Sequence, residues 1–122
     1  MKNSKRILVP TRKGYVSVYT ENILYISAED KCIVIYGKNG GKLEVSLSLK
    51  TVIEELDNKY FFKCHKSFIV NLNYIESINI EYKKIKLLFD KEIPLAKRRK
   101  KEFKSKLSAV ANSGAKRTPI PI

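Results

Sequence analysis

The sequence of 122 residues is poor in the side chains that build metal centres and covalent scaffolds. It holds two cysteines, Cys32 and Cys64, and one histidine, His65. Two cysteines are too few for a disulfide scaffold and cannot complete a four-cysteine zinc site, and one histidine excludes a three-histidine zinc site. We therefore expect no bound metal and a chain whose thiols are reduced.

Catalytic motifs and long apolar runs are also missing. There is no glycine-rich phosphate loop and no serine nucleophile elbow. Cys64 and His65 are neighbours on a predicted strand, so their side chains should point to opposite faces, which is poor geometry for a thiolate–imidazole pair. No apolar run approaches the roughly 18 residues that a membrane span needs. We predict a non-enzymatic, cytoplasmic domain without a cofactor.

Acidic residues are scarce in relation to basic ones. There are 12 Asp and Glu against 25 Lys and Arg, a formal net charge of +13. The last thirty residues hold nine of the basic residues and one acid, and the densest run is 97–101. A partner coated in phosphates would favour such an excess, and blocks of like charge are often interaction surfaces. The alternative is a solvated helix end that keeps the chain soluble.

Short apolar or alternating segments predict strands over most of the first ninety residues. Asn39 and Gly40 favour a tight hairpin turn with positive φ angles between two of them. Because proline has no backbone N–H to donate, Pro94 predicts that the last strand, near Ile93 and Leu95, lies at the edge of a sheet or leaves it. The predicted strands are 15–20, 22–27, 32–36, 42–48, 60–65, 67–72, 74–81 and 84–89. This spacing fits a mainly-β sandwich or barrel.

Two segments have the apolar spacing of a helix instead. One short helix is predicted over 48–57, with Ser48 as its N-cap. A basic helix is predicted within 97–111, since Phe103, Leu107 and Val110 follow at i, i+4 and i+7. We expect one domain over 1–111 and a flexible tail over 112–122, which contains two prolines and a glycine.

The stretch 61–71 carries the most informative pattern. On a strand without a bulge, Lys63, His65 and Ser67 would share one face and present donors to phosphate oxygens along a line. Lys66, at the centre of the stretch, could reach a base edge or a phosphate. The alternative is that His65 and Asn71 satisfy buried backbone groups beside a turn.

The same stretch resembles the Phe-x-Arg-x-His-Arg-Ser signature of the LytTR DNA-binding domain. The matching residues are Phe61, Lys63, His65, Lys66 and Ser67. The segments 22–26, 69–75 and 93–98 are similar to further family segments, in the same order. The resemblance covers about residues 5–108.

The resemblance implies a mainly-β, elongated domain of about ten strands in stacked sheets. It would have one short helix near 48–57 and a basic C-terminal helix. Such domains read double-stranded promoter DNA with loops and strand ends that enter the major groove. Carried over position by position, the expected base contacts are Lys66, Arg98 and Lys31. The expected contacts with the DNA backbone are Lys63, His65, Ser67, Lys97 and Arg99.

The sequence departs from the family pattern at three positions, and two of them are expected contacts. Lys63 and Lys97 replace arginines and lose the planar fork that grips phosphate or guanine at two points. Ala96 replaces a hydroxyl. Most family members also carry an N-terminal receiver domain, whereas this chain has a short basic lead. Its regulation is therefore expected from elsewhere, or the chain is a fragment.

Several alternatives remain open from the sequence. The domain is expected to act as a monomer or a DNA-induced dimer on paired repeats, with a membrane-bound or protein regulator as a further partner. Alternatively, the C-terminal helix with Phe103, Leu107 and Val110 serves a protein–protein or membrane-surface module. Oxidation of Cys64 would block binding if its thiol were accessible, and otherwise it is an inward-facing hydrophobe.

Overall fold

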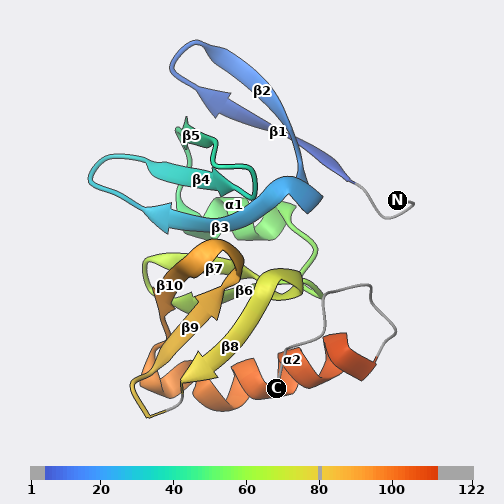
Figure 1. The fold of residues 1–122 in the computed structure, drawn as a ribbon. Coiled ribbons are helices and arrows are strands. Elements are labelled where there is room, and N and C mark those ends of the chain that lie inside the picture. Colours follow the sequence, from blue (N-terminus) through green and yellow to red (C-terminus); the bar gives the residue numbers. More distant parts are fainter. Residues whose placement is uncertain (1–4, 80, 113–122) are drawn as a thin grey trace.

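The fold is mainly β, as expected, in the computed structural model, which describes residues 5–79 and 81–112 (Figure 1). Ten strands occur in these ranges, and every pairing is antiparallel. The strands are β1 (Arg6–Thr11), β2 (Gly14–Tyr19), β3 (Ile23–Ala28), β4 (Ile33–Gly37), β5 (Lys42–Val45), β6 (Phe61–His65), β7 (Phe68–Asn71), β8 (Ile75–Asn79), β9 (Lys84–Leu87) and β10 (Lys91–Pro94). The helices are α1 (Leu49–Glu55) and α2 (Lys100–Asn112).

Three sheets are stacked along the length of the molecule. The hairpin β1–β2 lies at one end, and a five-stranded sheet of order β5-β4-β3-β7-β6 lies in the middle. A three-stranded sheet of order β10-β9-β8 and helix α2 lie at the other end (Figure 1). The elongated, stacked arrangement that the family resemblance implied is therefore confirmed.

The central sheet is buried on both of its faces. Phe61 and Ile69 join a core formed with β1, β2 and α1, whereas their neighbours Phe62 and Val70 join a second core formed with β8, β9, β10 and α2. Successive side chains of a strand point to opposite faces. Burial on both faces thus explains why several of these strands read as unbroken apolar runs rather than as alternating patterns.

Helix α1 begins and ends close to the predicted positions. The side chain of Ser48 accepts a hydrogen bond from the N–H of Thr51 at 3.1 Å and caps the helix, as predicted. Leu49 and Val52 bury the apolar face against the first core.

Helix α2 begins three residues later than the predicted start at 97. Residues Lys97–Arg99 form a single 3-10 turn instead. Phe103 and Val110 are fully buried in the second core, and Leu107 packs against it. The predicted tail over 112–122 lies outside the described residues except for its first residue.

Two further details differ from the sequence predictions. The sequence predicts no strand before residue 15, but β1 forms there, and its pairing with β2 turns Ile7 and Val9 into the first core. The hairpin between β4 and β5 has a positive φ, 91°, only at Gly40 and not at Asn39. The N–H of Gly37 bonds to the carbonyl of Gly41, so three residues form the loop rather than a two-residue Asn-Gly turn. Pro94 does end an edge strand, as predicted.

Candidate nucleic-acid interface

Three segments far apart in the sequence meet along one edge of the molecule. They are the loop between β3 and β4, the two-residue turn between β6 and β7, and segment 94–99 before α2. The N–H of Ala28 donates to the carbonyl of Ser67 at 2.8 Å and joins the first segment to the second. The N–H of Ala96 donates to the carbonyl of Cys64 at 2.9 Å and joins the third to β6. We call this continuous surface the basic edge, defined by Lys31, Lys63, His65, Lys66, Ser67, Lys97 and Arg98.

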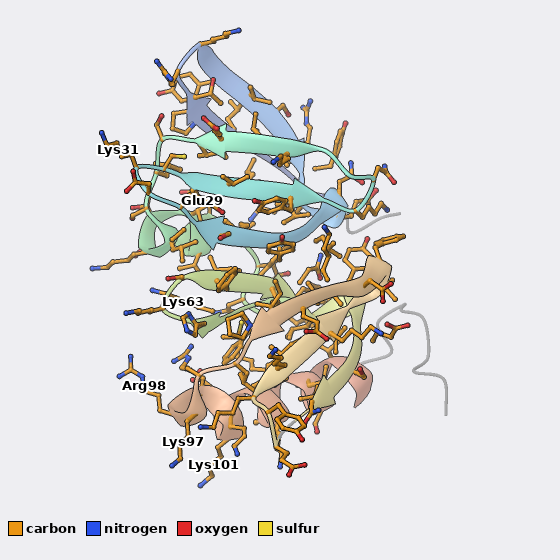
Figure 2. The ribbon with its side chains drawn as sticks, turned by 60° about the vertical axis from the view of Figure 1, so that its left-hand side comes forward. Glu29, Lys31, Lys63, Lys97, Arg98 and Lys101 are labelled. Carbon is orange, nitrogen blue, oxygen red and sulfur yellow. The ribbon has the colours of Figure 1, made fainter. Side chains whose placement is uncertain are left out.

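The cations of the basic edge point away from the fold. Lys31, Lys66, Lys97 and Arg98 are exposed, and Lys63 is half-buried. Figure 2 shows Lys31, Lys63, Arg98 and Lys97 following one another along one side of the molecule, with Lys101 next to Lys97. The structure therefore brings the predicted contact residues together, and it adds Lys101, which the sequence placed in the basic run but not in the site.

The predicted line of donors along β6 is wrong in detail. A β-bulge interrupts the pairing between Lys63 and His65, since Lys63 pairs with Ile69 and His65 with Phe68. Ser67 lies in the turn after the strand and not on it. A bulge bends its strand and changes the direction of the side chains beyond it. The three donors thus follow a bent path.

His65 and Asn71 both satisfy backbone groups, as the alternative interpretation proposed. The N–H of Ser67 donates to Nδ1 of His65 at 3.2 Å, so the neutral ring carries its proton on Nε2. The buried side chain of Asn71 donates to the carbonyl of Ile23 at 2.9 Å and accepts from the N–H of Asn73 at 3.0 Å. Asn71 is therefore structural, whereas His65 retains one free donor on the basic edge.

Two carboxylates, Glu29 and Asp30, lie in the β3–β4 loop beside Lys31, but the ion pairs of the described residues form elsewhere. Among the described residues, none of its lysines and not Arg98 forms an ion pair. Two lysines of the three-stranded sheet do so, in the pairs Lys84–Glu92, Lys86–Glu76 and Lys86–Asp90 at 3.2–3.9 Å. Cations that no carboxylate neutralises produce a positive potential, which attracts a polyanion.

Arg99 behaves differently from the cations around it. Its Nε donates to the carbonyl of Lys63, its Nη1 lies 3.1 Å from a carboxylate oxygen of Glu102, and its guanidinium lies over the ring of Phe62. No signal in the sequence separates Arg99 from its neighbours in the basic run, because the three partners are distant or depend on the exact end of a turn.

Cys64 faces the interior. Its side chain is fully buried in the second core, and its Sγ–H donates to the carbonyl of Pro94 at 3.4 Å. Burial raises the pKa of the Cys64 thiol to about 12. The thiol is therefore protonated at neutral pH and acts as a small hydrophobe, which favours the second of the two interpretations of this residue.

The described part of the chain contains neither a cluster of metal ligands nor a helix that could cross a membrane. In residues 5–79 and 81–112, no three His, Cys, Asp or Glu side chains come together in a way that would hold a metal ion. In the same ranges, no helix has the length and apolar character needed to cross a membrane.

Comparison with known proteins gives one family and several relatives. The family model of the LytTr DNA-binding domain matches residues 13–108. The transcriptional regulatory protein YpdB of Escherichia coli is 29% identical over 87 residues, which are 68% of this chain and 35% of that protein. An uncharacterized response regulatory protein of Vibrio cholerae is 29% identical over 68 residues, or 53% of this chain and 26% of that protein. The chain thus spans about a third of the length of the curated relatives it matches.

A solved structure has the same fold. It is the LytTr DNA-binding domain of a methyl-accepting/DNA response regulator from Bacillus cereus, which matches with a TM-score of 0.72. The match covers 84% of this chain and 95% of that chain at 23% sequence identity.

Proposed function

Since this chain belongs to the family of LytTR DNA-binding domains, we propose that it binds double-stranded promoter DNA in a sequence-specific manner as part of a transcription regulator. In this proposal the basic edge faces the duplex, and its turn and loops enter the major groove. The observation that carries the proposal is the convergence of three distant segments, joined by backbone hydrogen bonds, onto one edge with unpaired cations.

We assign the base contacts to the most exposed parts of the basic edge. Arg98 follows the 94–96 segment, carries a planar guanidinium and has no partner among the described residues. The pairing that its geometry favours is with O6 and N7 of guanine. Lys66 at the tip of the β6–β7 turn and Lys31 in the β3–β4 loop are the other two base contacts.

The remaining residues of the basic edge are assigned to the phosphates. Lys63 and Lys97 would bind as point charges, and His65 would donate through Nε2. The hydroxyl of Ser67 lies in the same turn as Lys66. These contacts place the turn on the duplex without reading its sequence.

The interior position of α2 disfavours the alternative of a membrane-surface helix. Phe103 and Val110, which that alternative would insert into a membrane, are fully buried in the second core. An interfacial helix needs a free apolar face. The lysine-rich side of α2 faces the solvent and extends the positive charge of the basic edge.

Selection from a random duplex library tests the proposed function directly. The chain is mixed with duplexes at about 150 mM salt, and the bound fraction is sequenced. We expect an enriched motif, and two spaced copies of it would indicate paired binding sites. Lys66→Ala should weaken or remove the enrichment, whereas Lys91→Ala, which removes an exposed charge from β10, should retain it. Tight binding without any enriched sequence would contradict the proposal and leave a nonspecific basic domain.

A further inference from the structure

Arg99 occupies the junction between the 3-10 turn Lys97–Arg99 and helix α2. Nε donates to the carbonyl of Lys63 at 2.9 Å, and Nη1 lies 3.1 Å from Oε1 of Glu102. The guanidinium carbon lies 4.8 Å from the centre of the Phe62 ring, and 34% of the side chain remains exposed. Only a planar, multidentate cation can stack on a ring while it donates in its own plane to two acceptors.

The bond to Lys63 closes an open sheet edge at an irregular point. Strand β6 is the outer strand of the five-stranded sheet, so no further strand satisfies its outward backbone groups. At the bulge, segment 94–99 replaces that strand: Ala96 donates to the carbonyl of Cys64, and Arg99 donates to the carbonyl of Lys63. These two bonds attach the chain that carries Arg98 to the strand that leads into the Lys66 turn.

From this geometry we infer that Arg99 is a positioning residue, which holds the segment of Lys97 and Arg98 in a fixed relation to the β6–β7 turn. This role rests on the proposed function, and it replaces the phosphate contact that the sequence suggested for Arg99. Its guanidinium is engaged by three groups of the protein, and the cations free to meet a duplex lie on either side of it.

The inference separates specific binding from general attraction to DNA. A bidentate base contact requires atoms within about half an ångström of their productive positions. Coulomb attraction to phosphates changes slowly with distance and tolerates such a displacement. Loss of the Arg99 contacts should therefore lower binding to a preferred duplex far more than binding to a scrambled one.

The substitution Arg99→Lys tests this role because it retains the charge and removes the planar fork. The probes are the duplex enriched from the random library and a scrambled duplex of the same length. We expect Arg99→Lys to lower affinity for the enriched duplex by about tenfold and to leave the scrambled duplex within about twofold. Lys104→Gln, which removes an exposed charge from the same helix, should change both affinities by the same factor.

A second measurement follows, in the free protein, the hydrogen bonds that hold segment 94–99 against β6. Amide hydrogen exchange at Ala96 reports the bond to Cys64, and it should quicken in Arg99→Lys while amides of the central sheet, such as Val70, stay protected. Protection at Val70 shows that the variant has folded. The attachment of segment 94–99 to β6 is thus measured without DNA.

Three results would overturn the inference. One is unchanged affinity of Arg99→Lys for both duplexes together with unchanged exchange at Ala96. Another is an equal loss of affinity for both duplexes in Arg99→Gln, together with a slope of log K against log salt that is shallower by about one. This result would indicate that Arg99 contacts a phosphate. If the natural chain enriches no sequence, the proposed function fails and this role fails with it. If the natural chain enriches a motif and Arg99→Lys binds it with unchanged affinity, the positioning role alone is overturned.

Discussion

Single residues of the basic run have different environments although they are neighbours in the sequence. Lys97 and Arg98 are exposed and unpaired among the described residues, whereas Arg99 is bound to Lys63, Glu102 and Phe62. The difference arises from the 3-10 turn, which directs consecutive side chains about 120° apart. A run of equal charges is therefore divided by local backbone geometry into residues that face solvent and one that faces the fold.

At the residue scale we predict a specific role for Arg98. Arg98→Ala should cost about 1–3 kcal/mol of binding free energy on the enriched duplex and relax the preference at one base pair. Fluorescence anisotropy titrations with the enriched duplex and its single-base variants measure both effects. Equal losses on enriched and scrambled duplexes would rule out the base contact and assign Arg98 to a phosphate.

Cys64 provides a second prediction at this scale, on stability and pH. Its raised pKa means that the folded chain holds the thiol proton more tightly than the unfolded chain does. The resulting contribution to stability is fully present below the ordinary thiol pKa of about 9.0 and is lost as the pH rises toward 12. Between about pH 8 and pH 10, the free energy of unfolding of the natural chain should fall by about 1 to 1.5 kcal/mol more than that of Cys64→Ala.

Urea denaturation at the two pH values measures this difference, and thiol alkylation supplies an internal comparison. Cys32 is partly exposed and Cys64 is fully buried, so iodoacetamide should modify Cys32 first in the native chain. Equal rates of modification at the two cysteines would contradict the buried, protonated state of Cys64.

Among the elements, α2 combines a structural face with a basic one. Phe103 is fully buried, and its ring lies 5.6 Å from that of Phe62, the same ring that carries Arg99. The helix therefore supports the basic edge from behind, through the second core. Its exposed lysines lie on the other side and leave the packing unaffected.

This arrangement predicts opposite effects of two neighbouring substitutions. Phe103→Ala should lower the free energy of unfolding by about 3–5 kcal/mol, because it removes a large buried side chain and leaves a cavity. Lys104→Ala should change it by less than about 0.5 kcal/mol, since this side chain is exposed. Chemical denaturation of both variants checks the difference, and a mild effect of Phe103→Ala would show that α2 is not held in the core.

For the molecule as a whole, the stacking of three sheets decides where the charge is presented. Ion pairs in the three-stranded sheet engage Lys84 and Lys86, whereas the cations of the basic edge, where the central sheet meets segment 94–99, form no ion pair among the described residues. A positive edge of this kind should bind a polyanion with a strong dependence on salt.

We predict the size of that dependence from the number of neutralised phosphates. If the basic edge and the lysines of α2 together neutralise roughly six to eight phosphates, log K should fall with log salt at a slope of about −5 to −7. Titrations between about 50 and 200 mM salt measure it. Lys97→Ala should reduce the slope by about one, whereas Arg99→Lys should leave it unchanged. A slope near −1 in the natural chain would contradict binding through the whole edge.

The class of fold and the segments that form it could be predicted from the sequence. Alternating and apolar runs predicted nine of the ten strands to within a few residues, and Ser48 predicted the start of α1, because these signals depend on near neighbours. The exception, β1, contains a proline and becomes a strand only through its pairing with β2. The motif around His65 likewise identified the family and most residues of the candidate site.

The arrangement of those residues depends on contacts between segments that are distant in the sequence. The contacts of Cys64 and Arg99 join β6 to segment 94–99, which lies some thirty residues away in the sequence, and the bulge between Lys63 and His65 arises in the pairing of β6 with β7. Contacts of this kind leave no periodic pattern in the sequence, because the free backbone carbonyls of an edge strand can bond to any segment that provides N–H donors. The sequence therefore specified which side chains are present, and the packing of distant segments specified which of them are free to bind.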